Sequence, residues 1–399
     1  MWLRCAKVNM SSLSLEENLL QLKTKGLKRT LRAVEGAQDR EMMVDGRKVL
    51  NFCSNNYLGL ANDPRVAQAA LKALREEGVG AGASRLVCGN MTSHRRLEEA
   101  LAQWKGTESC LVFNSGYTAN LGIIPSLCGR GDVIFADKLN HASLIDGMIL
   151  SGAAFKRYPH KDVETLRQWL KEAQDFRKRI VITDSVFSMD GDLAPLEEIV
   201  HLAKEYEAWV MIDEAHALGV LGKTGKGATE HFGLEDQIDI QMGTLSKSGG
   251  VFGAYCCGSK SLISFFLNSC RSFIYTTALP PSIAAAALKA IEIMQTEPER
   301  RGRLWEWTNL MRGELKRLGF DTLASETPII PILVGDSALA LRFSQKLWER
   351  GIFVQAIRPP TVPQNTARLR LTVMATHLRQ DVERALEALR EIGRQLRLI

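Results

Sequence analysis

The stretch RIVITDSVFSMDGDLAPLEEIVHLAKEYEAWVMIDEAH, residues 179–216, decides the fold class of this chain. Two short apolar runs, RIVITD (179–184) and AWVMID (208–213), flank a helical segment. Strands that are apolar throughout are typical of a parallel sheet covered by helices on both faces, and parallel neighbours need a crossover connection of this kind. The stretch therefore predicts a right-handed βαβ unit.

The same alternation extends over residues 108–257 and predicts a large, mainly parallel α/β domain. After Pro280-Pro281 the pattern changes to an Ala-rich helix (282–294), a Glu- and Arg-rich helical stretch, and shorter strands. We therefore expect an N-terminal helix and hairpin arm at 1–58, a large α/β domain at 59–293 and a small α+β domain at 294–399. The further expected strands are SCLVF (109–113), DVIFA (132–136), IDIQMG (238–243), VFGAYCC (251–257), PIIPILV (328–334), FVQAI (353–357) and ARLRLTV (367–373).

Local signals organise the N-terminal part of the chain. Residues 15–33 have helical apolar spacing, and Asp45-Gly46 between two short apolar runs predicts a β-hairpin. Asp63-Pro64 predicts a helix start, with aspartate as N-cap and proline in the first helical position. Met10 precedes a polar, helix-initiating stretch, so residues 1–9 are expected to be a dispensable extension.

Composition excludes several classes of protein. Hydrophobic residues make up 45% and charged residues 24%, as in an ordinary folded protein, which argues against disorder, collagen or a coiled coil. The net charge of +6 is spread along the chain, so no nucleic-acid partner is expected. No apolar run of about 18 residues predicts a membrane span, and no signal peptide is recognised. The eight cysteines lack the spacing of a metal site, which favours reduced thiols in a cytoplasmic protein and no metal.

Polar residues follow the predicted strands, at the edge where an open α/β sheet binds ligands. Small residues at Asn114–Thr118 open a helix whose free amides could hold a phosphate, although many turns have this composition. His141 follows the next strand, and a turn-rich run from Phe187 to Asp192 follows a third. A lone histidine at such a position is more often structural, so each signal is weak when taken alone.

Two charged residues strengthen the argument. Asp213 ends an otherwise apolar central strand, where an unpaired carboxylate is costly, and a protonated ring nitrogen would satisfy it. Lys247 lies among small residues after a buried strand, and a partly desolvated lysine readily forms a Schiff base. Together the sites supply a phosphate cradle, a flat ring, a carboxylate and a lysine. These are the groups that hold pyridoxal 5′-phosphate.

The order of five segments resembles the α-oxoamine synthases, pyridoxal-phosphate enzymes with the aspartate-aminotransferase fold (fold type I). The resemblance runs from about residue 15 to the C-terminus. It implies a decarboxylative condensation of an amino acid with an acyl thioester. The segments are NSGYTAN (114–120), DKLNHAS (137–143), SVFSMDGD (185–192), VMIDEAHALGVLG (210–222) and GTLSKSGGVFGAY (243–255).

The resemblance also implies residue roles. Lys247 would bind the cofactor covalently and remove the α-proton, with His141 stacked on the ring as the second catalytic residue. Asp213 would pair with the pyridine nitrogen, and Arg370 would hold the amino-acid carboxylate. The expected cofactor-binding residues are Gly116, Tyr117, His141, Ser188, Asp213, His216, Thr244 and Lys247, together with Thr276 and Thr277 from a neighbouring subunit. The expected substrate-binding residues are Arg29, His141, Thr361 and Arg370.

Three segments indicate which branch of this family the chain resembles: LNFCSNNYLGL (50–60), RSFIYTTALPP (271–281) and AIRPPTVPQNTARLRLTVMATH (356–377). They resemble the members that condense L-alanine with a pimeloyl thioester in biotin biosynthesis, as homodimers. Coenzyme A and acyl carrier protein both remain open as thiol carriers. Glycine C-acetyltransferase and other sister enzymes remain alternatives, because they share the cofactor shell. Ser248-Gly249-Gly250 and Ala217-Leu218 depart from the common family pattern, and ARLRLTV could also be an exposed alternating strand.

Three other functions agree less well with the sequence. Residues 217–224 nearly match a phosphate-binding P-loop, but the first glycine is replaced by Ala217, and a glycine-rich turn explains them better. Residues 78–83 lack the third glycine of a dinucleotide-binding motif and follow a helix. A catalytically inactive binding subunit is disfavoured because Lys247, Asp213 and His141 are all present.

Overall fold

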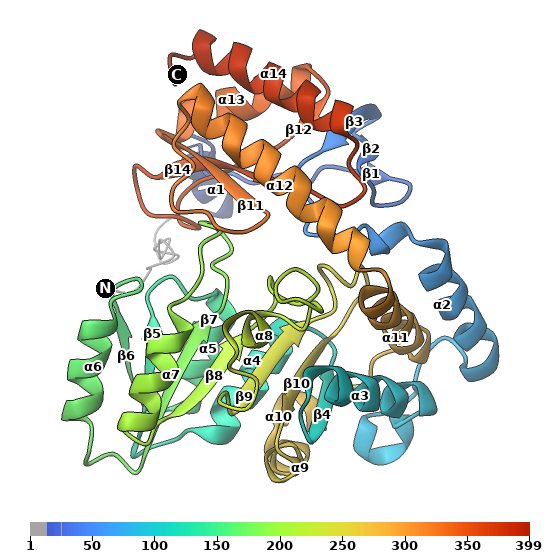
Figure 1. Ribbon diagram of the computed structural model, residues 1–399, viewed down its shortest axis with the longest axis vertical. Helices are drawn as coiled ribbons and strands as arrows, with labels where there is room; N and C mark the ends of the chain where they lie inside the picture. Colours follow the sequence, from blue (N-terminus) through green and yellow to red (C-terminus); the bar gives the residue numbers. More distant parts are fainter. Residues whose placement is uncertain (1–13, 25) are drawn as a thin grey trace. The chain divides into compact units, whose positions relative to one another are not determined.

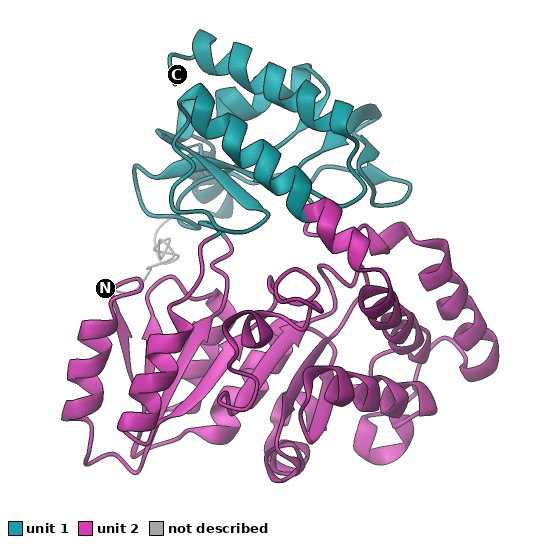
Figure 2. Cartoon of the chain, viewed as in Figure 1, with its two compact units in different colours: residues 1–54, 189–191, 305–399 teal, residues 55–188, 192–304 magenta. Residues whose placement is uncertain are grey.

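The computed structural model describes residues 14–24 and 26–399, which form two compact units (Figure 2). Unit 1 comprises residues up to Ser54, Met189–Gly191 and Trp305–Ile399, and unit 2 comprises Asn55–Ser188 and Asp192–Leu304. Most of the expected N-terminal arm thus shares a unit with the C-terminal part of the chain. The proposed extension at residues 1–9 lies outside the described residues.

Unit 2 is built on a seven-stranded sheet with strand order β4-β10-β9-β8-β7-β5-β6 (Figure 1). The strands β9, β8, β7, β5 and β6 run parallel, whereas β10 is antiparallel to β4 and to β9. The predicted large, mainly parallel sheet is therefore confirmed. The strands are β4 (Ser109–Phe113), β5 (Asp132–Asp137), β6 (Ala154–Tyr158), β7 (Lys178–Asp184), β8 (Trp209–Asp213), β9 (Ile240–Thr244) and β10 (Ala254–Gly258).

Strand β6 is the one strand of this sheet that sequence reasoning missed. Its sequence, AFKRY, contains two cationic residues, and only Tyr158 at its end is buried. The strand lies at the edge of the sheet and pairs only with β5. An edge position exposes the strand to solvent, so β6 lacks the continuous apolar run that marks the central strands.

The helices of unit 2 cover the sheet, and one apolar core lies between the strands and α4, α5, α9 and α10. Helices α3 and α7 also pack against the strands. The α-helices of unit 2 are α2 (Pro64–Glu77), α3 (Thr92–Lys105), α4 (Gly116–Leu127), α5 (Ala142–Ser151), α6 (Val163–Glu172), α7 (Leu196–Glu205), α8 (Ala228–Phe232), α9 (Lys260–Ser269), α10 (Arg271–Ile274) and α11 (Pro281–Thr296).

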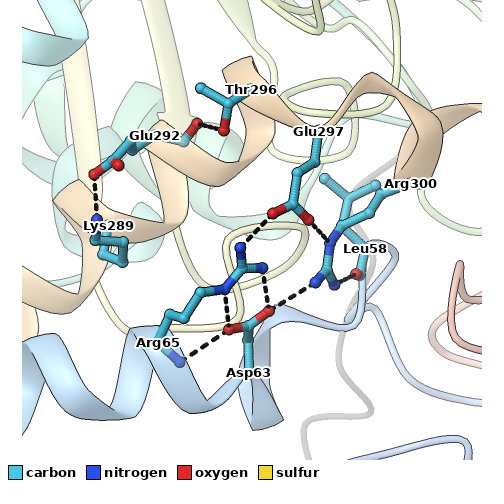
Figure 3. Close-up of polar contacts among 8 residues, drawn as sticks. All are labelled: Leu58, Asp63, Arg65, Lys289, Glu292, Thr296, Glu297 and Arg300. Carbon is cyan, nitrogen blue, oxygen red and sulfur yellow. Dashed lines mark hydrogen bonds and ion pairs between the residues drawn. The ribbon is translucent and has the colours of Figure 1, made fainter.

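The predicted helix start at Asp63-Pro64 is confirmed. Asp63 caps α2 by accepting a hydrogen bond from the backbone N–H of Arg65 at 3.0 Å, with Pro64 as first helical residue. Figure 3 shows the ion-pair network around this cap, in which Arg300 donates to Asp63 Oδ2 at 2.7 Å and to the Leu58 carbonyl at 3.1 Å. Glu297 pairs with Arg65 and Arg300. The network fastens the start of α2 to the start of α12 (Pro298–Leu318).

Unit 1 holds two small sheets, with strand orders β1-β2-β3-β12 and β11-β14-β13. The predicted hairpin is confirmed: β2 and β3 pair antiparallel, and Asp45 and Gly46 both have positive φ, as a tight two-residue turn requires. The remaining elements are α1 (Leu15–Thr24), β1 (Val34–Glu35), β2 (Glu41–Val44), β3 (Arg47–Asn51), β11 (Ile329–Gly335), α13 (Ser337–Glu349), β12 (Ile352–Phe353), β13 (Gln355–Ile357), β14 (Ala367–Thr372) and α14 (Arg379–Gln395).

Two properties of the described chain bear on function. Among residues 14–24 and 26–399, no helix combines the length and the apolar character that a membrane crossing requires. Within the same residues, no group of three or more histidine, cysteine, aspartate or glutamate side chains is arranged to hold a metal ion.

Candidate functional site

A pocket of about 210 Å³ in unit 2 gathers the turns that follow β4, β5, β7, β8 and β9. Each of these strands ends at the same edge of the sheet, because β4 and β9 are both antiparallel to β10. Every expected cofactor-binding residue except Thr276 and Thr277 lines this pocket. The lining residues are Gly116, Tyr117, His141, Ser143, Asp184, Ser188, Asp213, Ala215, His216, Met242, Thr244, Ser246 and Lys247.

Asp213 places a carboxylate in the wall of the pocket. The side chain is buried, and both oxygens accept hydrogen bonds from neutral donors: Asn120 Nδ2 reaches Oδ2 at 2.9 Å, and the Ala215 N–H reaches Oδ1 at 2.9 Å. Neutral donors orient the carboxylate without neutralising it. Such a group suits a cationic ring nitrogen, which is what the predicted cofactor presents. Asn120, in α4, was not predicted from the sequence.

Lys247 belongs to a chain of hydrogen bonds. Its Nζ lies 2.9 Å from His216 Nε2, and His216 Nδ1 lies 2.7 Å from the Tyr57 hydroxyl. Tyr57 is 1% exposed, so this hydroxyl has little access to water. The role of Tyr57 could not be predicted from the sequence, because its partner lies 159 positions away.

His141 caps the start of α5 and faces the pocket. Its backbone N–H donates to Asp184 Oδ2 at 2.6 Å, and its Nδ1 lies 2.8 Å from Ser143 Oγ. Although the residue is partly accessible to solvent, desolvation by the surrounding protein lowers the pKa of the imidazole, against the opposing charge of Asp213. A neutral, flat ring beside the pocket suits stacking on an aromatic cofactor.

Asp184 is a second carboxylate of this pocket that sequence reasoning missed. Burial raises its pKa well above the usual range, and the neighbouring Asp213 carboxylate raises it further. A raised pKa allows Asp184 to be protonated near Asp213, so that the two groups do not both carry charge. The sequence signal was present, since Asp184 ends an apolar strand as Asp213 does.

The start of α4 provides the expected anion cradle. Ser115 is the N-cap and accepts a hydrogen bond from Thr118 N–H, so Gly116 and Tyr117 occupy the first two helical positions. Backbone N–H groups in a first turn lack acceptors within the helix and favour an anion. A Cβ at Gly116 would lie 3.3 Å from Met242 Cε, so glycine leaves room for the Met242 side chain at the start of α4.

Thr276 and Thr277 lie just beyond α10 and do not line the pocket. Asn114 Nδ2 donates to Thr276 Oγ1 at 3.2 Å and to the Thr277 carbonyl at 3.0 Å. Asn114 therefore holds this segment next to β4, two residues before the cradle.

Apart from His141, which lines the pocket in unit 2, the expected substrate-binding residues lie in unit 1. Arg29 Nη2 donates to Thr361 Oγ1 at 3.1 Å. Arg370 is on β14, the central strand of its sheet, opposite Pro331 on one side and Gln355 on the other. Every residue of β14 is buried, so the alternative of an exposed alternating strand is wrong.

The two departures from the family pattern contact each other. Ser248 Oγ donates to the Leu218 carbonyl, and both residues are buried. A Cβ at Gly250 would lie 2.2 Å from the Ala61 backbone nitrogen, and its φ of +67° also favours glycine. The changed residues on the two turns are thus mutually packed, which explains how both are accommodated beside Lys247.

The nucleotide-binding alternatives do not fit the backbone. Residues 217–224 lie within a series of turns, and the next helix, α8, starts only at Ala228 and is five residues long. A P-loop instead continues directly into a helix. The glycine-rich run at 78–82 follows α2 rather than a strand, as expected.

Fold and pocket together define a fold type I pyridoxal-phosphate enzyme, and the chain belongs to the aminotransferase class I and II family, whose model matches residues 47–389. Within that family it groups with the 8-amino-7-oxononanoate synthases, which are pyridoxal-phosphate-dependent acyltransferases. The enzyme of that name from Geobacter sulfurreducens is 50% identical and spans 97% of this chain and 99% of its own length. The enzyme of the same name from Symbiobacterium thermophilum is 49% identical and spans 96% of this chain and 98% of its own length.

Solved structures agree with this placement. Serine palmitoyltransferase from S. paucimobilis, a structure containing bound pyridoxal phosphate, superimposes with a TM-score of 0.92 at 34% identity, covering 96% of this chain and 98% of its own. The 8-amino-7-oxononanoate synthase from Francisella tularensis has a TM-score of 0.76 at 28% identity, and the match covers 88% of this chain and 99% of that structure's chain. The predicted family, fold class and cofactor are therefore confirmed.

Proposed function

We propose that the chain condenses L-alanine with a pimeloyl thioester to give 8-amino-7-oxononanoate, CO2 and a free thiol, a step of biotin biosynthesis. The single observation that carries this proposal is the convergence of Lys247, Asp213 and His141 on one pocket in a chain about half identical to enzymes named for that product. The relatives' names concern their own reaction, and the two substrates are our inference.

When bound, pyridoxal phosphate supplies an electron sink for the charge that develops at the amino acid's α-carbon. Lys247 would hold the cofactor covalently and then move the α-proton. Its Nζ lies within hydrogen-bonding distance of His216, so the imidazole can exchange a proton with the amine. The Tyr57 hydroxyl fixes the opposite ring nitrogen of His216 and thereby keeps the imidazole oriented.

The other pocket residues would bind and orient the cofactor. The amides of Gly116 and Tyr117 would hold the phosphate, and Asp213 would keep the pyridine nitrogen protonated. The neutral imidazole of His141 would stack on the ring, while Ser188 and Thr244 line the remaining wall. Because Asn120 and the Ala215 amide orient both oxygens of Asp213, the carboxylate needs little rearrangement to do this.

Arg370 is proposed to bind the carboxylate of the amino acid, since a guanidinium offers two parallel hydrogen bonds. Arg29 and Thr361, which are hydrogen-bonded to each other, are also proposed to bind the substrate. The acyl chain of a pimeloyl donor adds methylene groups, each contributing about 0.8 kcal/mol when buried. An apolar channel would therefore discriminate strongly against acetyl or succinyl donors.

We also propose a homodimer in which Thr276 and Thr277 complete the phosphate site of the neighbouring subunit. Closed two-fold dimers are the commonest soluble assembly. The thiol carrier is proposed to be coenzyme A or acyl carrier protein. The cytoplasm is the proposed compartment, because its reducing conditions suit the free cysteines of the described chain.

Competition between substrates tests the proposal. We expect kcat/KM for L-alanine with pimeloyl-CoA or pimeloyl-acyl carrier protein to exceed that for glycine with acetyl-CoA by at least about 50-fold, as three buried methylenes alone would allow. Comparing the two pimeloyl donors also identifies the carrier. A higher kcat/KM for glycine plus acetyl-CoA would assign the chain to glycine C-acetyltransferase activity instead.

A further inference from the structure

A fully buried ion pair lies close to the pocket, but neither of its two residues lines the pocket. Lys105, the last residue of α3, pairs with Glu214, which directly follows Asp213, and both side chains have 0% exposure. Removing two charges from water is costly unless their remaining hydrogen-bonding groups are satisfied. None of the roles proposed above requires this pair.

The ammonium group of Lys105 and the carboxylate of Glu214 also form hydrogen bonds to other residues. Lys105 Nζ donates to Glu214 Oε2, to the Lys226 carbonyl and, at 3.4 Å, to Thr229 Oγ1. The Thr229 N–H donates to Glu214 Oε1 at 3.2 Å. The ammonium group has three N–H donors and three acceptors here. It therefore ties the beginning of the segment 214–229 to its end.

The glycines of this segment allow the chain to approach the pair closely. A Cβ on Gly227, which has a φ of +117°, would lie 2.5 Å from Glu214 Oε1. A Cβ on Gly219 would lie 3.2 Å from Ser248 Cβ, next to the catalytic lysine. The glycine-rich run that resembled a P-loop is thus explained by close packing around Glu214 and Ser248.

The first residues of the same segment contact Asp213 and Lys247, which line the pocket, and Ser248, which follows Lys247. The Ala215 N–H donates to Asp213 Oδ1 at 2.9 Å, and His216 Nε2 lies 2.9 Å from Lys247 Nζ. The Leu218 carbonyl accepts from Ser248 Oγ. A shift of the segment would therefore move His216 and the donors around Asp213 and Lys247 together.

We propose that Lys105 and Glu214 are positioning residues, which hold the segment 214–229 so that His216 and Asp213 are correctly placed against Lys247. This inference rests on the proposed function of the pocket. A buried pair is commonly no more stabilising than apolar residues of similar size, but it specifies one arrangement of its hydrogen-bonding partners. The pair is thus better explained by placement of the segment than by stability.

The test replaces both charges with apolar groups of similar length, in the variant Lys105→Met/Glu214→Met. Because no single charge is left buried, this variant is expected to fold, with a Tm within a few degrees of wild type. We expect kcat to fall by about 100-fold, as for a small misplacement of catalytic groups, with little change in KM for alanine. Lys156→Met, which removes the lysine of the exposed Lys156–Glu172 pair, is the matched control and should retain wild-type kcat.

Two further readouts do not depend on the acyl substrate. In the cofactor-free protein, the His216 imidazole should titrate at a different pH in the double variant, followed by histidine ¹³C NMR and assigned with His216→Asn. In the cofactor-bound protein, the visible absorption band should also titrate at a shifted pH. Thr229→Val, which keeps both charges and removes one acceptor, should shift His216 in the same direction by less.

The outcomes separate this inference from the proposed function. If wild-type protein fails to condense alanine with a pimeloyl donor while the His216 titration still moves, the substrate assignment fails and the positioning role stands. Unchanged His216 and band titrations in the double variant, with wild-type kcat, would show that the pair is structural only. If the double variant does not fold, an unchanged His216 titration in Thr229→Val would overturn the inference.

Discussion

Lys247 is the residue on which the proposed chemistry depends most. We expect Lys247→Ala to fold normally, to lack the visible band of a covalently bound cofactor and to lose at least about 10⁴-fold in turnover, because it loses both a covalent anchor and a general base. Circular dichroism, the absorption spectrum and turnover assays measure the three effects. Lys223→Ala, at an exposed turn, is the matched control. Near-normal turnover in Lys247→Ala would contradict the mechanism.

Tyr57 offers a finer test at the same scale. Tyr57→Phe removes the hydroxyl that lies 2.7 Å from His216 Nδ1 and leaves that nitrogen buried without this partner. We expect a loss of about 1–3 kcal/mol in the free energy of unfolding and a displaced pH–rate profile, since the imidazole beside Lys247 changes its proton affinity. Urea titration and kcat against pH measure both. An unshifted profile would exclude Tyr57 from the proton path, whatever the change in stability.

Helix α2 depends on the network around its N-cap. Asp63→Ala removes the cap and two guanidinium partners at once, so we expect a loss of about 2–4 kcal/mol in the free energy of unfolding, from the cap and from charged hydrogen bonds. Asp63→Asn keeps a capping oxygen and should lose less. Equal losses in the two variants, measured by urea unfolding, would show that the capping hydrogen bond contributes nothing beyond the ion pairs of Asp63.

A histidine joins the ends of β5 and β6 to the turn after β7. His160 Nε2 lies 2.9 Å from Asp192 Oδ2, and Nδ1 lies 3.1 Å from Asp137 Oδ1. Burial alone lowers the pKa of His160, but the two carboxylates outweigh it and raise the pKa to about 9. A group whose pKa is higher in the folded state stabilises the fold most below its unfolded pKa, near 6.5, and that contribution disappears as pH rises through 9.

We therefore expect wild-type protein to lose about 1.5–3 kcal/mol of unfolding free energy between pH 6 and pH 9.5 through this group. His160→Gln should show a correspondingly smaller pH dependence over the same range. Urea unfolding of both proteins at the two pH values measures the difference. Parallel pH profiles for the two proteins would show that the imidazolium does not contribute.

At the scale of the whole molecule, the prediction concerns assembly. We expect the purified chain to sediment with twice its mass of 44.3 kDa, because a second copy is proposed to complete the phosphate site. Thr277→Ala should then weaken pyridoxal-phosphate binding about tenfold, the effect of losing one hydrogen bond to a charged group. Analytical ultracentrifugation and a fluorescence titration measure these effects. A fully active monomer at micromolar concentration would contradict the proposal.

The sequence alone determined the features of this protein that depend on neighbours in the chain. Apolar runs marked the central strands, the Asp45-Gly46 pair marked a hairpin, and Asp63-Pro64 marked a helix start. Each of these signals depends only on residues that are close together in the sequence. The pocket could be located for the same reason: parallel strands end at one edge, so the residues after them meet there. Strand β6 was missed because an edge strand does not need to be apolar.

Only the tertiary structure decided which distant side chains support those residues. Tyr57 meets His216, Asn120 meets Asp213, and Lys105 meets Glu214 across 159, 93 and 109 positions. Nothing in the spacing of a sequence encodes such pairs, because the partner of a buried polar group is set by how helices and turns pack over the sheet. Burial then makes each pair obligatory, since a polar group removed from water must find its hydrogen bond within the fold.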